Sequence, residues 1–207
     1  MRSNCCSEKF VNLFRFMINL SKSIEILISV QIIIISSFLP VFISLPFTNN
    51  LSQTFQMPIT WQLPSIMIIT IIFNSKIVIK AFSIYLIIGL FFIPVFHQGG
   101  SLGYLLIPNF GYLLGMYPLI KIIDNLNKIN HKINYYNLLK TGIMAICSMH
   151  LVGIIYNSIQ ILYFRQKDTL LYNISKYSLG SFGYHLLIVT ILTLWIKFIN
   201  NKRYRRK

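Results

Sequence analysis

The chain has 207 residues, of which 55% are hydrophobic and 11% are charged, and its formal net charge is +15 at pH 7. Soluble domains carry about 25% charged residues, so this composition excludes a soluble globular protein and indicates that a lipid bilayer surrounds much of the chain. The positive charge does not indicate a nucleic-acid partner, because Lys and Arg stand at the ends of apolar runs and form no basic stripe with interleaved aromatic residues. One domain is expected at this length.

The N-terminal residues 1–22 are predicted to form a cytoplasmic amphipathic segment. The apolar residues that would share one side of its helix are Phe10, Leu13, Phe14 and Met17. Basic residues interrupt the segment and no small-residue cleavage site follows, so we do not expect a secretory signal. Beyond it, residues 23–199 are predicted to form a single membrane domain and residues 200–207 a basic cytoplasmic tail.

Six apolar runs in the membrane domain are candidate transmembrane helices. They are residues 24–45, 61–73, 77–95, 111–123, 138–164 and 177–199. A helix of about 20 residues crosses a bilayer, so the second and fourth runs are short and need a thinner bilayer or shielding neighbours. The sequence therefore predicts an all-α integral membrane protein with six transmembrane helices.

The distribution of charge predicts the orientation of these helices. The loops at residues 46–60 and 97–110 contain no Lys, Arg, Asp or Glu. With both termini in the cytoplasm, the outer segments hold only Arg165, Lys167 and Lys176, and the remaining 16 of the 19 basic residues lie on the inner side. Cytoplasmic loops retain Lys and Arg during membrane insertion, so this asymmetry places both termini inside.

Polar residues collect near the predicted outer ends of the helices, where a cavity open to the outside would form. Polar side chains at this depth should face the bundle interior, because lipid offers no hydrogen bonds. The candidate substrate-binding residues are Thr60, Gln62, Gly99, Gly100, Asn109, Gly111, Tyr112, Asn157, Gln160 and His185. Each has a structural alternative: the amides and His185 can hydrogen-bond another helix, and Gly111 with Gly115 is a spacing that also serves close helix packing.

The sequence predicts no catalytic set. Only four acidic residues are present, which argues against paired-carboxylate chemistry, and no cluster has metal-ligand spacing. Neither a cofactor nor an ATP-binding motif is indicated, so active transport would need an energising partner. Two other classes stay open: a structural subunit of a membrane complex without a small ligand, and a lipid-modifying membrane enzyme that would rely on His97, His150 and His185.

Five segments in series resemble the BioY family, whose members are biotin-specific substrate-binding (S) components of energy-coupling-factor (ECF) transporters. Met57-Pro58-Ile59-Thr60-Trp61-Gln62-Leu63 resembles the family's V-P-I-T-x-Q segment, and Tyr85-Leu86-Ile87-Ile88-Gly89 its Y-L-L-L-G. Ile93-Pro94-Val95-Phe96 is similar to L-P-V-F. The stretch Gly99-Gly100 to Gly103 is similar to G-G-x-x-G, and Pro108-Asn109-Phe110-Gly111-Tyr112-Leu113-Leu114-Gly115-Met116 to P-T-G-G-Y-L-L-G-F. The resemblance is dense from Met57 to Leu119.

The resemblance implies an S-component bundle of six helices that captures a small vitamin, biotin or a related one, from outside and releases it inward with a transmembrane T component and a pair of ATPases. It implies that residues 47–57 close over the substrate as a lid. Two departures follow. In the family, the Asp and Lys of a P-G-D-x-x-K motif help hold biotin. The corresponding stretch here is Phe182-Gly183-Tyr184-His185-Leu186-Leu187, which keeps only the Gly. His185, Gln160 and Asn157 are therefore candidate substitutes for the missing Asp and Lys. The family's small residues for T-component docking in the first helix correspond best to Ser29 and Ser36.

The compartment is predicted only broadly. The usage of amino acids, rich in Ile, Asn and Lys and poor in Ala, is typical of an AT-rich genome. We therefore expect a bacterial cell (inner) membrane, with a plastid membrane as the alternative.

Overall fold

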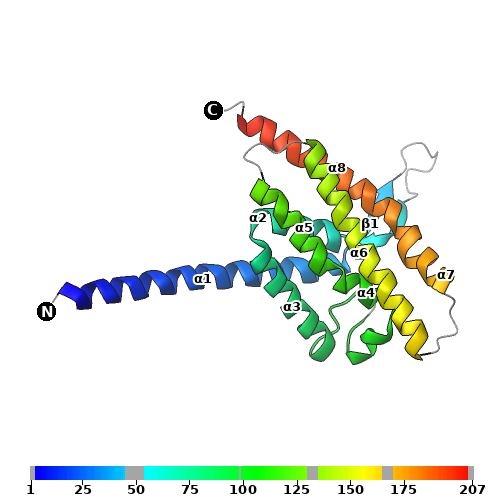
Figure 1. Ribbon diagram of the computed structural model, residues 1–207, viewed down its shortest axis with the longest axis horizontal. Helices are drawn as coiled ribbons and strands as arrows, with labels where there is room; N and C mark the ends of the chain where they lie inside the picture. Colours follow the sequence, from blue (N-terminus) through cyan, green and yellow to red (C-terminus); the bar gives the residue numbers. More distant parts are fainter. Residues whose placement is uncertain (1–2, 45–53, 98, 130–134, 165–169, 205–207) are drawn as a thin grey trace.

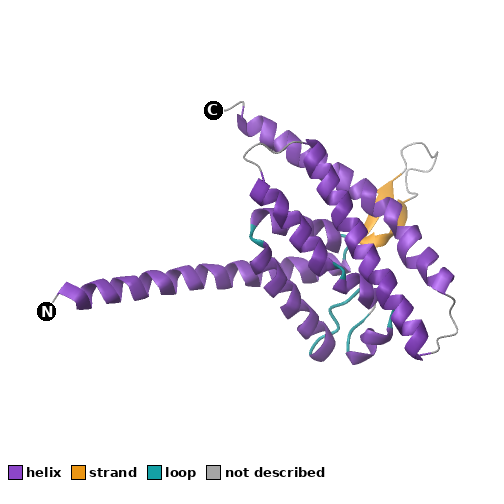
Figure 2. Cartoon of the chain, viewed as in Figure 1, coloured by secondary structure: helices purple, strands orange, loops and turns teal. Residues whose placement is uncertain are grey.

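The chain forms a helical bundle to which one small antiparallel sheet is added (Figure 2). The computed structural model describes residues 3–44, 54–97, 99–129, 135–164 and 170–204. The elements in chain order are α1 (Ser3–Phe38), β1 (Pro40–Ser44), β2 (Thr54–Thr60), α2 (Gln62–Ile72), α3 (Ser75–Phe91), the 3-10 helix η1 (Leu102–Leu106), α4 (Asn109–Leu114), α5 (Met116–Ile129), α6 (Tyr135–Phe164), α7 (Leu170–Asn173), the π-helical segment η2 (Ile174–Leu179) and α8 (Gly180–Tyr204).

Three segments of the described chain are long and apolar enough to cross a membrane, which agrees with the prediction of an integral membrane protein. They are Leu20–Phe38, Tyr135–Tyr163 and Leu170–Trp195. The predominantly helical architecture is thereby confirmed. The count of six spans stays a prediction, because α2, α3 and α5 are shorter than the roughly 20 residues that a bilayer-spanning helix needs. The cytoplasmic position of both termini also stays a prediction.

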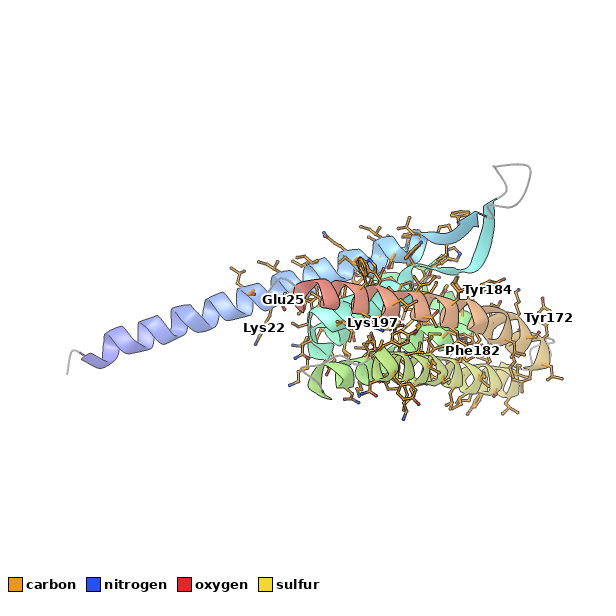
Figure 3. All side chains as sticks on the ribbon, turned by 90° about the horizontal axis from the view of Figure 1, so that it is seen from above. Lys22, Glu25, Tyr172, Phe182, Tyr184 and Lys197 are labelled. Atoms are coloured by element: carbon orange, nitrogen blue, oxygen red, sulfur yellow. The ribbon has the colours of Figure 1, made fainter. Side chains whose placement is uncertain are left out.

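Helix α1 is continuous from the predicted amphipathic segment into the first predicted span. Its 36 residues make a helix about 54 Å long. The N-terminal half projects away from the other helices, as two perpendicular views show (Figure 1 and Figure 3), and the C-terminal half packs against α2 and α3. Ser29 and Ser36 lie on the packed side, where both are buried and bond carbonyls of their own helix. These two small residues therefore belong to the bundle interior and not to its outer surface.

The first predicted span is shorter than expected, because α1 ends at Phe38 and the chain continues as a β-hairpin. Pro40 has no backbone N–H and disfavours helical backbone at Leu39, so the helix cannot run on to residue 45. Strand β1 pairs with β2 in antiparallel register, with Pro40 opposite Thr60 and a bulge before Phe42. Residues 47–53 of the expected lid, residues 47–57, lie outside the described residues.

The fourth predicted span is divided into α4 and α5, which meet at Gly115. A Cβ at this position would lie 2.5 Å from the Met149 carbonyl oxygen of α6, so only Gly allows the two backbones to approach this closely. A Cβ at Gly111 would meet the ring of Tyr156 at 2.8 Å. Close packing of small residues is thus what this pair of glycines provides.

A buried carboxylate connects α5 with the start of α3. Asp124 of α5 is buried, and it accepts hydrogen bonds from the hydroxyl and the backbone N–H of Ser75, the first residue of α3. These bonds satisfy otherwise open groups at the start of α3 and place a negative charge at the positive end of the helix. Asp124 therefore fixes the position of α5 against α3.

Candidate functional site

A cavity of about 440 Å³ lies beneath the β-hairpin, where the hairpin, α2, α3, α4, α6 and the start of α8 converge. This volume is in the range of about 300–1,000 Å³ that small-molecule sites occupy. Five of the ten predicted site residues line it. They are Thr60, Gln62, Asn109, Tyr112 and His185. The structure thus brings these five polar residues from distant segments together at one cavity, and their role in binding stays a prediction.

Aromatic side chains form one wall of the cavity. The rings of Tyr85 and Phe96 meet edge to face with centroids 5.3 Å apart, and Phe96 packs on Tyr104 at 4.5 Å. Burial raises the pKa of Tyr104, in the loop segment η1, to about 12, so its phenol stays neutral and can donate a hydrogen bond at any physiological pH. Such a wall accepts a flat or cyclic apolar body, while the phenols offer polar contacts.

Several polar atoms at the cavity have no hydrogen-bond partner among the described residues. They include Gln62 Nε2 and the Tyr112 hydroxyl, both of which are buried on side chains that line the cavity. The amide of Gln62 lies beside the Tyr85 phenol, and Asn157 and Ser178 lie beside the Tyr112 phenol. Buried polar groups are normally hydrogen-bonded, so unpaired ones that border a cavity are available to water or to a bound molecule.

Two histidines from α6 and α8 meet behind the cavity. His150 Nε2 lies 3.1 Å from His185 Nδ1, and Ser178 Oγ lies 3.0 Å from His150 Nδ1. His185 lines the cavity, whereas His150 and Ser178 are buried behind it. A short π-helical segment, η2, carries Ser178 into this position, and such segments are frequent at functional sites.

Lys176 contributes the one formal positive charge among the described residues that line the cavity. Its ammonium group lies 5.1 Å from the ring centre of Tyr177 and 5.7 Å from that of Tyr172. Lys176 is one of the three basic residues predicted on the outer side, and it is not among the ten predicted site residues. Its position next to the predicted outer end of the last helix is the sequence feature that could have indicated a place at the cavity.

Four predicted residues take supporting positions near the cavity. Gly100 packs where a Cβ would lie 2.5 Å from Pro94 Cα, and Gly111 packs against Tyr156. Gly99 has φ +113°, a conformation that favours glycine, and it pairs with Phe96 in an isolated bridge. Gln160 Nε2 donates to the Leu105 carbonyl at 2.8 Å, and that carbonyl also accepts the Tyr156 hydroxyl. Gln160 therefore secures the segment that carries Tyr104.

Asn157 is the tenth predicted residue. It is fully buried on α6, and among the described residues neither of its amide atoms has a hydrogen-bond partner. It lies beside Tyr112 and does not itself line the cavity. Asn157 and Gln160 are predicted to share one helix face, but they lie at different places: Asn157 is behind the cavity, and Gln160 is against the η1 segment.

Comparisons with known proteins identify the family. A search of curated proteins gives no match. Among solved structures, the fold is similar to a crystal structure at 2.1 Å of the S-component for biotin from an ECF-type ABC transporter. The two share 19% sequence identity with a TM-score of 0.63, over 88% of this chain and 92% of the other. The model of the BioY family matches residues 12–199, so the chain belongs to the BioY family.

Proposed function

We propose that the chain is the substrate-capture subunit of an ECF biotin transporter and that biotin binds in the cavity beneath the hairpin. The family, the shared fold with a biotin S-component and the 440 Å³ cavity support this function. The observation that carries it is the convergence on one cavity, within the described part of the chain, of unpaired buried polar atoms and one lysine. A subunit that binds and releases biotin unchanged needs no catalytic group.

The chemistry of the cavity suits the two polar ends of biotin. A carboxylate needs a cation or several donors when it leaves water, and Lys176 supplies the cation. His185 follows nine residues later on the same helical segment, which corresponds to about 13 Å along a helix axis. The cyclic ureido group would then lie deeper, near Gln62, Tyr112 and His185, and the aromatic wall would cover the ring system.

The direction of capture follows from the charge asymmetry. The hairpin and η1 come from the uncharged loops that the positive-inside rule assigns to the outer face. The cavity would therefore load from outside. Release inward would need a T component and a pair of ATPases in the same membrane, either a bacterial inner membrane or a plastid membrane.

Equilibrium binding tests this function. Purified protein in nanodiscs is titrated with radiolabelled biotin, with biotin methyl ester as the ligand that lacks the carboxylate charge. A scavenging receptor is expected to bind biotin with nanomolar affinity, or about −12 kcal/mol. Absence of saturable biotin binding would contradict the proposal and favour the structural-subunit alternative.

Lys176→Met tests the assignment of the carboxylate. We expect this variant to lose at least about tenfold in affinity for biotin and to bind the methyl ester as the wild type does, because only the charge-assisted contact is removed. Lys121→Met is the matched control, since Lys121 is exposed on α5 and does not line the cavity. Equal losses for acid and ester would place the carboxylate elsewhere.

A further inference from the structure

Three side chains behind the cavity form a hydrogen-bonded row that ends at the cavity wall. Ser178 Oγ lies 3.0 Å from His150 Nδ1, and His150 Nε2 lies 3.1 Å from His185 Nδ1. Ser178 is 6% exposed and His150 is 4% exposed, whereas His185 lines the cavity. The row thus connects a buried hydroxyl with a ring that a bound molecule would touch.

The hydroxyl hydrogen of Ser178 determines which atom donates and which accepts in each hydrogen bond of the row. Within the described part of the chain, the hydrogen bond that Ser178 Oγ makes is with His150 Nδ1, and the Tyr112 hydroxyl, although it lies beside Ser178, makes no hydrogen bond of good geometry with it. If Ser178 accepted a hydrogen bond from His150, its own buried hydrogen would lack an acceptor, which is unfavourable. Ser178 therefore donates to His150 Nδ1.

This direction determines the hydrogen on each ring. An imidazole that accepts at Nδ1 is neutral and carries its hydrogen on Nε2, so His150 donates from Nε2 to His185 Nδ1. By the same rule His185 carries its hydrogen on Nε2, the nitrogen that remains for a bound molecule. We propose that Ser178 and His150 are positioning residues that hold neutral His185 as a hydrogen-bond donor toward the substrate.

The proposal rests on the proposed function and specifies part of its selectivity. If Lys176 receives the carboxylate of biotin, the acceptor that faces His185 is the ureido carbonyl. In 2-iminobiotin an imino group replaces this carbonyl, and its protonated form offers only donors. A fixed donor at His185 therefore favours biotin, whereas a ring free to change tautomer would accept either ligand.

The first measurement compares the two ligands. Wild-type protein is expected to prefer biotin to 2-iminobiotin by at least about tenfold, and Ser178→Ala is expected to lower biotin affinity about tenfold while 2-iminobiotin affinity stays within about threefold. Ser178→Thr, which keeps the hydroxyl, should retain the preference. Ser148→Ala is the matched control, because that hydroxyl bonds the Ala145 carbonyl of its own helix. An unchanged preference in Ser178→Ala would overturn the proposal.

The second measurement does not depend on any ligand. Nitrogen-15 NMR of histidine-labelled wild-type protein, with His185 assigned from the signals missing in His185→Gln, reads the tautomer directly. We expect hydrogen on Nε2 and a bare Nδ1, with Ser178→Ala producing a mixture. Hydrogen on Nδ1 of His185 in the wild type would overturn the proposal. Protein that binds neither ligand yet shows the expected tautomer would contradict the biotin function, while it would support the inferred donor and acceptor roles of Ser178, His150 and His185.

Discussion

The substitution Asn157→Leu separates the energetic cost of a buried amide from its use in binding. Asn157 has 0% exposed surface, and neither amide atom has a hydrogen-bond partner among the described residues. Each unsatisfied buried group costs about 1–3 kcal/mol, and Leu has the same branching pattern with no polar atom. The two unsatisfied amide atoms of Asn157 together cost more free energy than the single overpacking penalty of about 1–3 kcal/mol that Leu could introduce. We expect a net gain of about 1 kcal/mol, which raises Tm by about 2–4 °C for a chain of this size.

The same substitution should weaken ligand capture. Asn157 lies beside the Tyr112 phenol, which lines the cavity, so Leu places an apolar side chain where that phenol now has a polar neighbour. We expect biotin affinity to fall about tenfold. Thermal unfolding and biotin binding are measured on the same nanodisc sample, with Ser158→Ala as control because that hydroxyl bonds its own helix at the Ile154 carbonyl. Unchanged affinity would remove Asn157 from the site, and a lower Tm would refute the stability argument.

Two further predictions concern stability away from the cavity. Asp124→Ala removes the acceptor of two hydrogen bonds from Ser75, so we expect a loss of about 1–2 kcal/mol in unfolding free energy with biotin affinity unchanged within about threefold; an unchanged Tm would contradict the capping role. Gly115→Ala places a Cβ 2.5 Å from a backbone oxygen of α6 and should cost about 1–3 kcal/mol. Gly183→Ala is its control, because a Cβ there meets nothing within 4 Å and should be neutral or stabilising by up to about 1 kcal/mol. Equal Tm values for the two variants would refute the packing argument.

The helical class and the membrane setting could be predicted because they depend on properties summed over long segments. Apolar runs of sufficient length and the placement of Lys and Arg report on lipid and orientation without any knowledge of contacts. The end of α1 at Phe38 carries a local signal that the prediction passed over, because Pro40 disfavours helical backbone before it. The pairing of β1 with β2 has no comparable signal in the strands themselves, since it joins two segments that are separated in the sequence.

The composition of the site was predictable only in part. Gln62, Asn109 and Tyr112 became candidates because they are polar and stand near the predicted outer ends of helices, and all three line the cavity. The contact between His150 and His185 joins residues 35 positions apart on two helices, and its existence depends on the rotation of each helix about its axis. A sequence pattern gives that rotation only to within a helical face, which is too coarse for a hydrogen bond.

Cysteine protection at the cavity tests the central claim most directly. In protein with Cys5, Cys6 and Cys147 replaced by Ser, Thr60→Cys places a single thiol at the cavity wall beneath the hairpin. A membrane-impermeant maleimide is added to sealed vesicles of known orientation, with and without biotin. The account predicts labelling from the outer side only, and protection by biotin at concentrations that match its affinity. Labelling from the cytoplasmic side alone, or labelling that saturating biotin leaves unchanged, would contradict capture of biotin from outside in this cavity.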